Sequence, residues 1–320
     1  MRSDLARPVR DLIGYVLQRL VLMVATLFAI VTLTFFLMHL VPGGPFVSDK
    51  MMAPEIQAAL DAKFHLDQPV WLQYLNYLKG VATFNFGPSF KYPGMTVNQM
   101  ILEGLPVTAK VGMLALICVI GLGVPMGVIA AIFRNRWPDS LVMVVATIGV
   151  AVPSYVIATL ALYVFALRLG WVPTFGVDDW RGYFLPVFAL SGFWISFIAR
   201  LARSSLLETL QQDYMTTAKA KGLRPGQILF KHGLRNSLIP VVTVLGPVAA
   251  NLLTGSFVIE QIFALPGIGR HFVLSITNRD YTAIMGITIF YATILMVMIF
   301  IVDMLYLVLD PRIKYGRRAR

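Results

Sequence analysis

The residue types that most often carry chemistry in proteins are few and scattered in this sequence. Its four histidines are His39, His65, His232 and His271, and Cys118 is its one cysteine. No H-E-x-x-H spacing occurs, and a thiolate metal site or an intramolecular disulfide needs more than one cysteine. A serine hydrolase of the G-x-S-x-G type is not indicated, because the sequence lacks that turn. These residues predict no metal, redox or hydrolytic centre.

Phosphate chemistry would need a different signature. A chain that hydrolyses ATP by itself would carry the G-x-x-x-x-G-K-[ST] loop, whose backbone amides hold the phosphates. The nearest glycine cluster is Gly121, Gly123 and Gly127, which lies in an apolar run with no lysine after it. We interpret these glycines as positions where helices pack closely. The sequence predicts no cofactor bound by this chain and no enzymatic activity, so energy for any work comes from elsewhere.

Asp303 is the one acid well inside a long apolar run. An ionised group at that depth is costly, so it should face protein or water and find a partner. The residue fits two interpretations. It could move protons in a stand-alone proton-coupled carrier, or it could form a structural pair with a basic residue of an inner loop. The sequence favours the structural pair.

A basic segment between apolar runs, residues 203–237, has the pattern of two short helices. Asp213 to Lys221 favours a helix, Gly222 is a natural C-terminal cap, and Pro225 suits the first turn of a second helix that runs toward Pro240. The small residues of the first helix would let it enter a groove of another protein. The alternative is an ordinary basic loop at a membrane surface. The basic residues available to rim a contact or meet lipid headgroups are Lys219, Lys221 and Arg224.

The composition identifies the elements that position these residues. The chain is 58% hydrophobic and 13% charged, whereas soluble domains carry about 25% charged residues. We therefore predict an all-α, polytopic membrane protein. A span needs roughly 20 residues, and six stretches meet or approach that length: 12–40, 107–133, 141–167, 183–199, 238–259 and 283–309. The first is too long for a signal-peptide core, so we expect it to be retained.

The distribution of lysine and arginine sets the orientation. With six spans, one side of the membrane holds both termini, the 134–136 turn and the 200–235 loop. That side carries 18 of the 27 basic residues, which predicts that it is cytoplasmic. The net charge of +11 follows from this clustering and does not indicate nucleic acid. The predicted divisions are an extension (1–11), a first helix (12–40), an extracytoplasmic loop with short amphipathic helices (41–106), a five-helix core (107–309) and a basic tail (310–320).

A family resemblance appears at the basic segment. The spacing Thr216-Thr217-Ala218, three residues and then Gly222 resembles the E-A-A-x-x-x-G loop of the membrane subunits of ATP-binding-cassette importers. Two threonines replace the acid and the first alanine, as in the peptide-transport branch. Four further segments, in order, resemble the B-type permeases of the oligopeptide and dipeptide permease family. These are FGPSFKY (86–92), VIEQIFALPGIG (258–269), NRDY (278–281) and DPRIKY (310–315).

The resemblance implies a type I importer permease fold in a bacterial plasma membrane and a non-catalytic role in oligopeptide transport. It implies a second homologous permease, two cytoplasmic ATPase subunits that bind ATP and magnesium, an extracytoplasmic peptide-binding protein and membrane lipid as partners. By their position in the motif, the residues expected to couple this chain to the ATPase are Thr216, Thr217, Ala218, Lys219, Ala220, Lys221, Gly222 and Leu223. We expect Pro153, Ser154 and Asn251 near the translocation pathway. Nickel chelates, haem and glycosides remain open as cargo, because related systems carry them.

Overall fold

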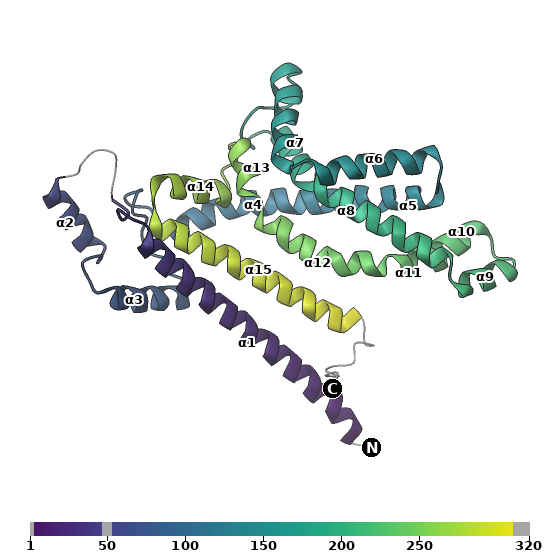
Figure 1. Cartoon of the computed structure of the whole chain (residues 1–320), viewed down its shortest axis with the longest axis horizontal. Coiled ribbons are helices and arrows are strands. Elements are labelled where there is room, and N and C mark those ends of the chain that lie inside the picture. The colour runs from purple at the N-terminus through teal and green to yellow at the C-terminus, as the bar shows by residue number, and fades with distance from the viewer. Residues whose placement is uncertain (1–2, 47–52, 310–320) are drawn as a thin grey trace. The chain divides into compact units, whose positions relative to one another are not determined.

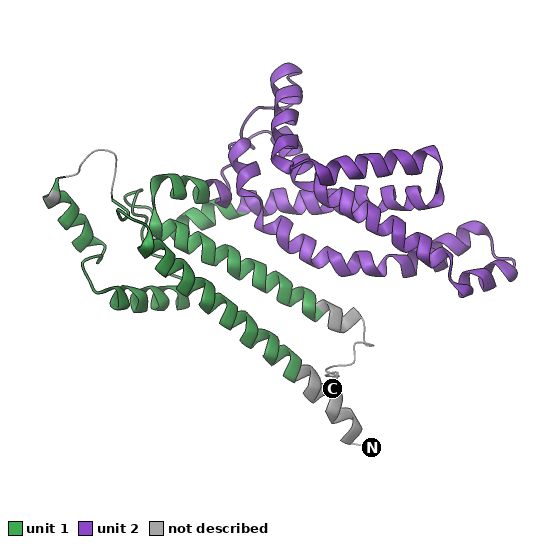
Figure 2. Ribbon diagram, in the orientation of Figure 1, with its two compact units in different colours: residues 1–105, 271–320 green, residues 106–270 purple. Residues whose placement is uncertain are grey.

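The computed structural model describes residues 3–46 and 53–309, and every regular element in those ranges is a helix. The tail 310–320, with the DPRIKY segment, lies outside the described residues. The chain divides into two compact units, residues 1–105 with 271–320 and residues 106–270 (Figure 2). The helices α4 (Val97–Cys118) and α14 (Ile268–Asn278) each contribute residues to both units.

The first unit is built around two long helices. They are α1 (Ser3–Leu40) and α15 (Tyr281–Leu309), which pack against each other (Figure 1). Two short helices, α2 (Pro54–Lys63) and α3 (Val70–Ala82), lie between α1 and α4 in sequence. The α3 helix packs on α1 through Tyr74, whose hydroxyl lies 2.7 Å from the hydroxyl of Thr32.

The second unit packs its helices around α8. After α4 the chain forms η1 (Val119–Gly123), α5 (Val124–Ile132), α6 (Trp137–Ala151), α7 (Ser154–Ala161), η2 (Leu162–Arg168), η3 (Trp180–Tyr183) and α8 (Phe184–Leu210). It then forms α9 (Asp213–Ala220), α10 (Pro225–Gln227), η4 (Ile228–Leu234), α11 (Arg235–Ser237), α12 (Ile239–Thr254) and α13 (Phe257–Ile262). Segments η1, η2 and η4 are π-helical.

Five helical segments in the described ranges are long and apolar enough to cross a membrane. They are 14–40, 97–132, 180–210, 239–262 and 281–304. The predicted third span, 141–167, is not one straight helix. Residues 137–151 and 154–168 bend by 103° at Val152 and Pro153, and they give a sixth span only if the bent pair counts as one. Proline lacks an amide hydrogen and fixes its own backbone angle, so the helix stops there.

The boundaries of other predicted spans also shift. The second span begins at Val97 instead of 107, and the fourth extends to Leu210 instead of ending at 199. The fifth breaks at Gly255, where the backbone is left-handed with φ +76°, before α13 resumes. Hydropathy reports where side chains are apolar, whereas helices continue through polar residues until a turn stops them.

Glycines set the closest helix contacts in the second unit. A Cβ added at Gly127 would lie 2.4 Å from the Ala199 carbonyl oxygen, and one at Gly123 would lie 3.1 Å from the Ile195 carbonyl oxygen. The prediction of close packing is thus confirmed for these two residues, where η1 and α5 meet α8. It is wrong for Gly121, which has open space around it.

Candidate functional site

The first helix of the basic segment, α9, ends in a compact hydrogen-bonded cap. Gly222 takes a left-handed backbone with φ +75°. Its amide donates to the Lys219 carbonyl at 3.0 Å, and the Leu223 amide donates to the Ala218 carbonyl at 3.4 Å. These two bonds form a Schellman motif, which favours glycine because the left-handed conformation is strained for other residues. The cap turns the chain sharply into α10.

The inner face of α9 packs on its own chain. Met215 and Ala218 are 0% and 8% exposed, and they form an apolar cluster with Ile228 of η4. Leu210, at the end of α8, and Leu223 pack against this cluster. The cluster therefore joins the end of α8, α9 and η4 into one elbow, which we define as residues 203–237.

The outer face of α9 carries most of the residues predicted to couple. Ala218 and the partly buried Leu223 turn inward, which the sequence spacing did not distinguish. Within the described chain, no salt bridge involves Lys219 or Lys221. A polar, basic face with few internal partners is available to another protein. The exposed members of the predicted set are Thr216, Thr217, Lys219, Ala220, Lys221 and Gly222.

The second half of the elbow is fastened to α8. The Ser205 hydroxyl donates to the Ser237 carbonyl at 2.7 Å, and both residues are buried. A Cβ on Gly233 would already lie 3.5 Å from a Leu206 methyl carbon. On the other side, the Asn236 amide donates to the Tyr214 hydroxyl at 3.0 Å and ties α11 to α9. These contacts connect α9 and α11 to α8. Figure 1 shows α9 and α10 together at that end of α8.

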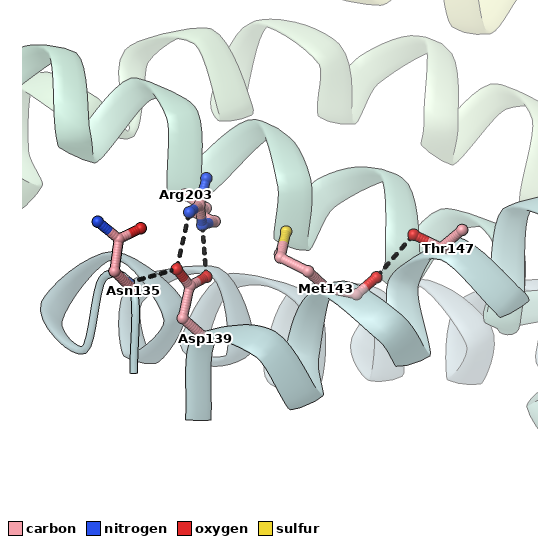
Figure 3. A network of polar contacts seen from close by, with 5 residues as sticks. All are labelled: Asn135, Asp139, Met143, Thr147 and Arg203. Carbon is pink, nitrogen blue, oxygen red and sulfur yellow. Dashed lines mark hydrogen bonds and ion pairs between the residues drawn. The ribbon is translucent and has the colours of Figure 1, made fainter. Parts of the chain in front are cut away.

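An ion pair holds α8 near the start of the elbow (Figure 3). The Arg203 guanidinium donates to both carboxylate oxygens of Asp139, at 2.6 and 2.8 Å, and the Asn135 amide donates to the same carboxylate at 2.9 Å. Asp139 is 4% exposed. Two parallel bonds from a guanidinium are stronger and more directional than one. The pair thus fixes the 134–136 turn and α6 to α8, and neither residue was singled out from the sequence.

A buried carboxylate organises the VIEQIFALPGIG segment. Glu260 is 2% exposed, and it accepts a hydrogen bond from the Thr108 hydroxyl at 2.9 Å and one from the Gly269 amide at 2.8 Å. The Thr108 hydroxyl oxygen also accepts from the Ile268 amide at 3.0 Å. A Cβ on Gly267 would lie 2.2 Å from a Glu260 carboxylate oxygen. We call Glu260, Thr108, Gly267, Ile268 and Gly269 the Glu260 knot.

A second buried acid joins two distant motifs in the first unit. Asp280 of the NRDY segment is 0% exposed and caps the start of α15. It accepts a hydrogen bond from the Ser89 hydroxyl and one from the Phe90 amide at 3.1 Å. The segments 86–92 and 278–281, which carried part of the resemblance, are therefore one structural cluster.

Asp303 is paired, but its partner is not in an inner loop. Arg19 Nε of α1 lies 3.2 Å from Asp303 Oδ2, and Arg19 also donates to the Tyr15 hydroxyl at 3.0 Å. The predicted structural pair is present between α1 and α15, so the expected inner-loop partner was wrong. An acid inside a span needs a partner, and Arg19 supplies one to Asp303.

The three predicted pathway residues lie on separate elements. Pro153 precedes α7 at the 103° bend and is exposed, and Ser154 is the first residue of α7. Asn251 is exposed on α12. Among the described residues, no hydrogen bond joins Asn251 to Ser154, so nothing in this chain alone assembles the three into a site.

The apolar helices are those of a multi-pass membrane protein, and its family places it among the membrane subunits of transport systems. Residues 123–315 match the protein family described as "Binding-protein-dependent transport system inner membrane component". Residues 12–111 match the family that describes the N-terminal region of such components. The chain belongs to this family, and it is an inner membrane protein.

Curated relatives extend the likeness over nearly the whole chain. The dipeptide transport system permease protein DppB of Bacillus subtilis is 47% identical over 305 residues, which cover 95% of this chain and 99% of the relative. The oligopeptide transport system permease protein OppB of Escherichia coli K12 is 41% identical over 309 residues, which cover 95% and 100%. Family membership supports a transport subunit over a stand-alone carrier.

A solved structure shows the same fold at low sequence identity. The MetNI methionine ABC transporter in an inward-facing conformation aligns with a TM-score of 0.53 and 17% identity, covering 66% of this chain and 96% of that chain. The chain has the fold of ABC importer membrane subunits.

Proposed function

We propose that this chain is a permease subunit of an ATP-driven importer of short peptides. The support for the cargo is the naming of relatives that are 41–47% identical over 95% of the chain as dipeptide or oligopeptide permeases. In this proposal the chain forms part of the membrane pathway together with a second homologous permease. A peptide-binding protein delivers cargo from outside, and two ATPase subunits supply ATP and magnesium chemistry from inside.

The observation that carries the coupling role is the two-faced construction of the elbow. The outer face of α9 is exposed and basic, whereas its inner face is anchored to α8 and to the residues leading into α12. A partner that binds the outer face of α9 would therefore move α9 together with the end of α8 on which it packs. Because a partner can shift a two-state equilibrium only by binding one state more tightly, the ATPase pair must hold α9 differently in its two nucleotide states.

The test is transport by the assembled complex in vesicles. The chain is reconstituted with its candidate second permease, ATPases and binding protein, and uptake of a labelled dipeptide or oligopeptide is measured with and without ATP. We expect uptake only with ATP and only with all subunits present. Accumulation by vesicles that contain this chain as their sole protein would contradict the proposal.

A second arm tests the elbow. Gly222→Val places a β-branched side chain at a left-handed position, where such residues are strained, and so weakens the cap of α9. We expect ATP hydrolysis to continue while peptide uptake falls at least about tenfold. That factor corresponds to a loss of about 1.4 kcal/mol in coupling free energy, which lies within the usual range for coupled sites. Tightly coupled uptake by this variant would remove the lever assignment.

A further inference from the structure

The short helix α3 packs on the last part of the first span. The Tyr74 hydroxyl of α3 lies 2.7 Å from the Thr32 hydroxyl of α1, and the Tyr74 ring centroid lies 5.4 Å from that of Phe36. Both α1 residues belong to the span 14–40. Since a helix rises 1.5 Å per residue, Thr32 lies about 12 Å before the end of that span. The α3 helix therefore lies beside the outermost part of α1, where hydrocarbon gives way to lipid headgroups.

One face of α3 is apolar and exposed. Trp71, Leu75, Leu78 and Ala82 follow one another at intervals of four, three and four residues, so they form one stripe along the helix. Trp71 and Leu75 are 64% and 51% exposed, and α3 has no buried residue. Apolar surface of this kind is unfavourable in water, so we expect it to be covered in the membrane-bound protein. We call these four residues the α3 stripe.

The α3 stripe continues the exposed surface of α1. Phe35 is 2% exposed and stacks on Tyr77, whereas the neighbouring Phe36 is 44% exposed and contacts Tyr74. At about 100° per residue around a helix, Tyr74 lies between Tyr77 and the stripe. The exposed surface at Phe36 therefore runs through Tyr74 into the stripe. The apolar window of this span is only 11% buried in the chain, and lipid is the ordinary surrounding of such a span.

The size of the α3 stripe also favours lipid over a protein partner. The helix has 13 residues, which make it about 20 Å long. A strip of that length that is about 10 Å wide covers on the order of 200 Å². A stable protein interface buries about 800 Å² on each partner. Lipid has no such requirement, because each apolar side chain that enters the bilayer contributes separately.

The residue types at the α3 stripe match the boundary of a membrane. Tryptophan is enriched at this boundary, where its ring meets both headgroups and acyl chains. Lys79 follows Leu75 by one turn, is exposed and forms no salt bridge within the described chain. The α3 sequence contains no acid. A lysine beside an apolar face can lay its stem along that face and extend its ammonium group to a lipid phosphate.

We propose that α3 is an interfacial helix that binds phospholipid of the leaflet at which α1 ends, the one that the sequence predicts to be extracytoplasmic. Trp71, Leu75 and Leu78 lie at the boundary of the acyl chains, and Lys79 meets a phosphate. Through Tyr74, the bound helix fixes the depth of the end of α1 in the membrane. This role depends neither on the cargo nor on coupling through α9.

The experiment places a nitroxide spin label on two sides of α3 in the full chain, in phospholipid nanodiscs. Cys118, the only native cysteine, is replaced by alanine. The label is attached at Leu75→Cys on the stripe or at Asn76→Cys, which is also exposed but points about 100° away. Relaxation by oxygen, which concentrates in lipid, and by a water-soluble nickel chelate gives the depth. We expect the Leu75→Cys label about 5–10 Å below the phosphates and the Asn76→Cys label in water.

Repeating the measurement in the complete complex distinguishes lipid from a protein partner. Oxygen access at Leu75→Cys that persists after assembly supports the proposal. Loss of access to both reagents on assembly would mean that a protein covers the stripe, and equal nickel access at both positions would mean that the stripe lies in water. Either result overturns the proposal. Both variants change exposed side chains, so the Tm should not change; if Leu75→Cys does not fold, Trp71→Cys carries the same measurement.

A charge reversal tests the lysine. Lys79→Glu in the labelled chain should move the Leu75→Cys label toward water, and the shift should be larger in nanodiscs of anionic lipid. Lys79→Arg keeps the charge and should leave the depth unchanged. A label that does not move in Lys79→Glu would contradict the phosphate contact.

Discussion

The elbow and the Glu260 knot both come from segments with a family resemblance, yet their side chains are used in opposite ways. In the elbow, polar and basic residues of α9 face outward and have few internal partners. In the knot, a carboxylate that is 2% exposed is satisfied by the chain itself, and a glycine leaves room for it. One segment with a family resemblance therefore presents an exposed polar face, which we propose contacts another protein, whereas the other is fixed internally.

The comparison predicts its largest effect at Glu260. Glu260→Ala removes the acceptor of two buried donors and leaves a cavity, so we expect a loss of about 3–5 kcal/mol in unfolding free energy. Glu260→Gln keeps the shape and should cost less. Unfolding in mixed micelles measures both. An Ala variant as stable as the wild type would show that the knot does not hold this region.

The next effect concerns the ion pair that anchors α8. Arg203→Ala leaves the Asp139 carboxylate, which is 4% exposed, with only the Asn135 amide. We expect a loss of about 2–3 kcal/mol, below the fully buried case because Arg203 is partly exposed. The double variant Asp139→Ala with Arg203→Ala should be less destabilised than the sum of the single variants. If the free-energy losses of the two single variants added up to that of the double variant, this double-mutant cycle would show that the two residues do not interact energetically.

Substitutions on the inner face of the elbow should lower the unfolding free energy less than those at Glu260 and Arg203. Their effect should be confined to α9. Met215→Ala truncates a side chain that is 0% exposed in a small cluster, so we expect a loss of about 2 kcal/mol. Hydrogen exchange should show faster opening of α9 amides while α12 amides keep their protection. Uniform loss of protection throughout the second unit would mean that α9 is not a separate element.

The smallest stability effect should come from the outer face. Thr217→Ala and Lys219→Ala change exposed side chains, so unfolding should move by less than about 0.5 kcal/mol. In the assembled complex the same variants should lower the peptide uptake obtained per ATP hydrolysed. Destabilisation comparable to that of Met215→Ala would erase the distinction between the two faces.

Much of this architecture follows from sequence because membrane spans are long apolar runs. The positions of α1 and α15 could be predicted from hydropathy, and close packing at Gly123 and Gly127 could be predicted from their small size, although not that α8 is the partner. The left-handed cap at Gly222 could also be predicted, because glycine after a helical stretch has few other uses. These features depend on local propensity and on burial in lipid.

The remaining features depend on partners far away in sequence. Asp139 reaches Arg203 across 64 residues, and Thr108 reaches Glu260 across 152 residues. A single sequence shows that an aspartate follows a proline or that a glutamate lies in an apolar segment. It does not show which distant group forms the hydrogen bond with that carboxylate. Helical periodicity around Ala218 was too weak in an eight-residue helix to show that this residue turns inward.

One pair of cysteine variants tests the central claim directly. With Cys118, the only native cysteine, replaced by alanine, Ala220→Cys puts a thiol on the exposed face of α9 and Ala218→Cys puts one on its buried face. The complete complex is treated with a short bifunctional thiol reagent, with cysteines placed on the ATPase surface. The account predicts that Ala220→Cys cross-links to the ATPase and stops uptake, whereas Ala218→Cys does neither. Equal cross-linking at both positions, or none at Ala220→Cys, would contradict it.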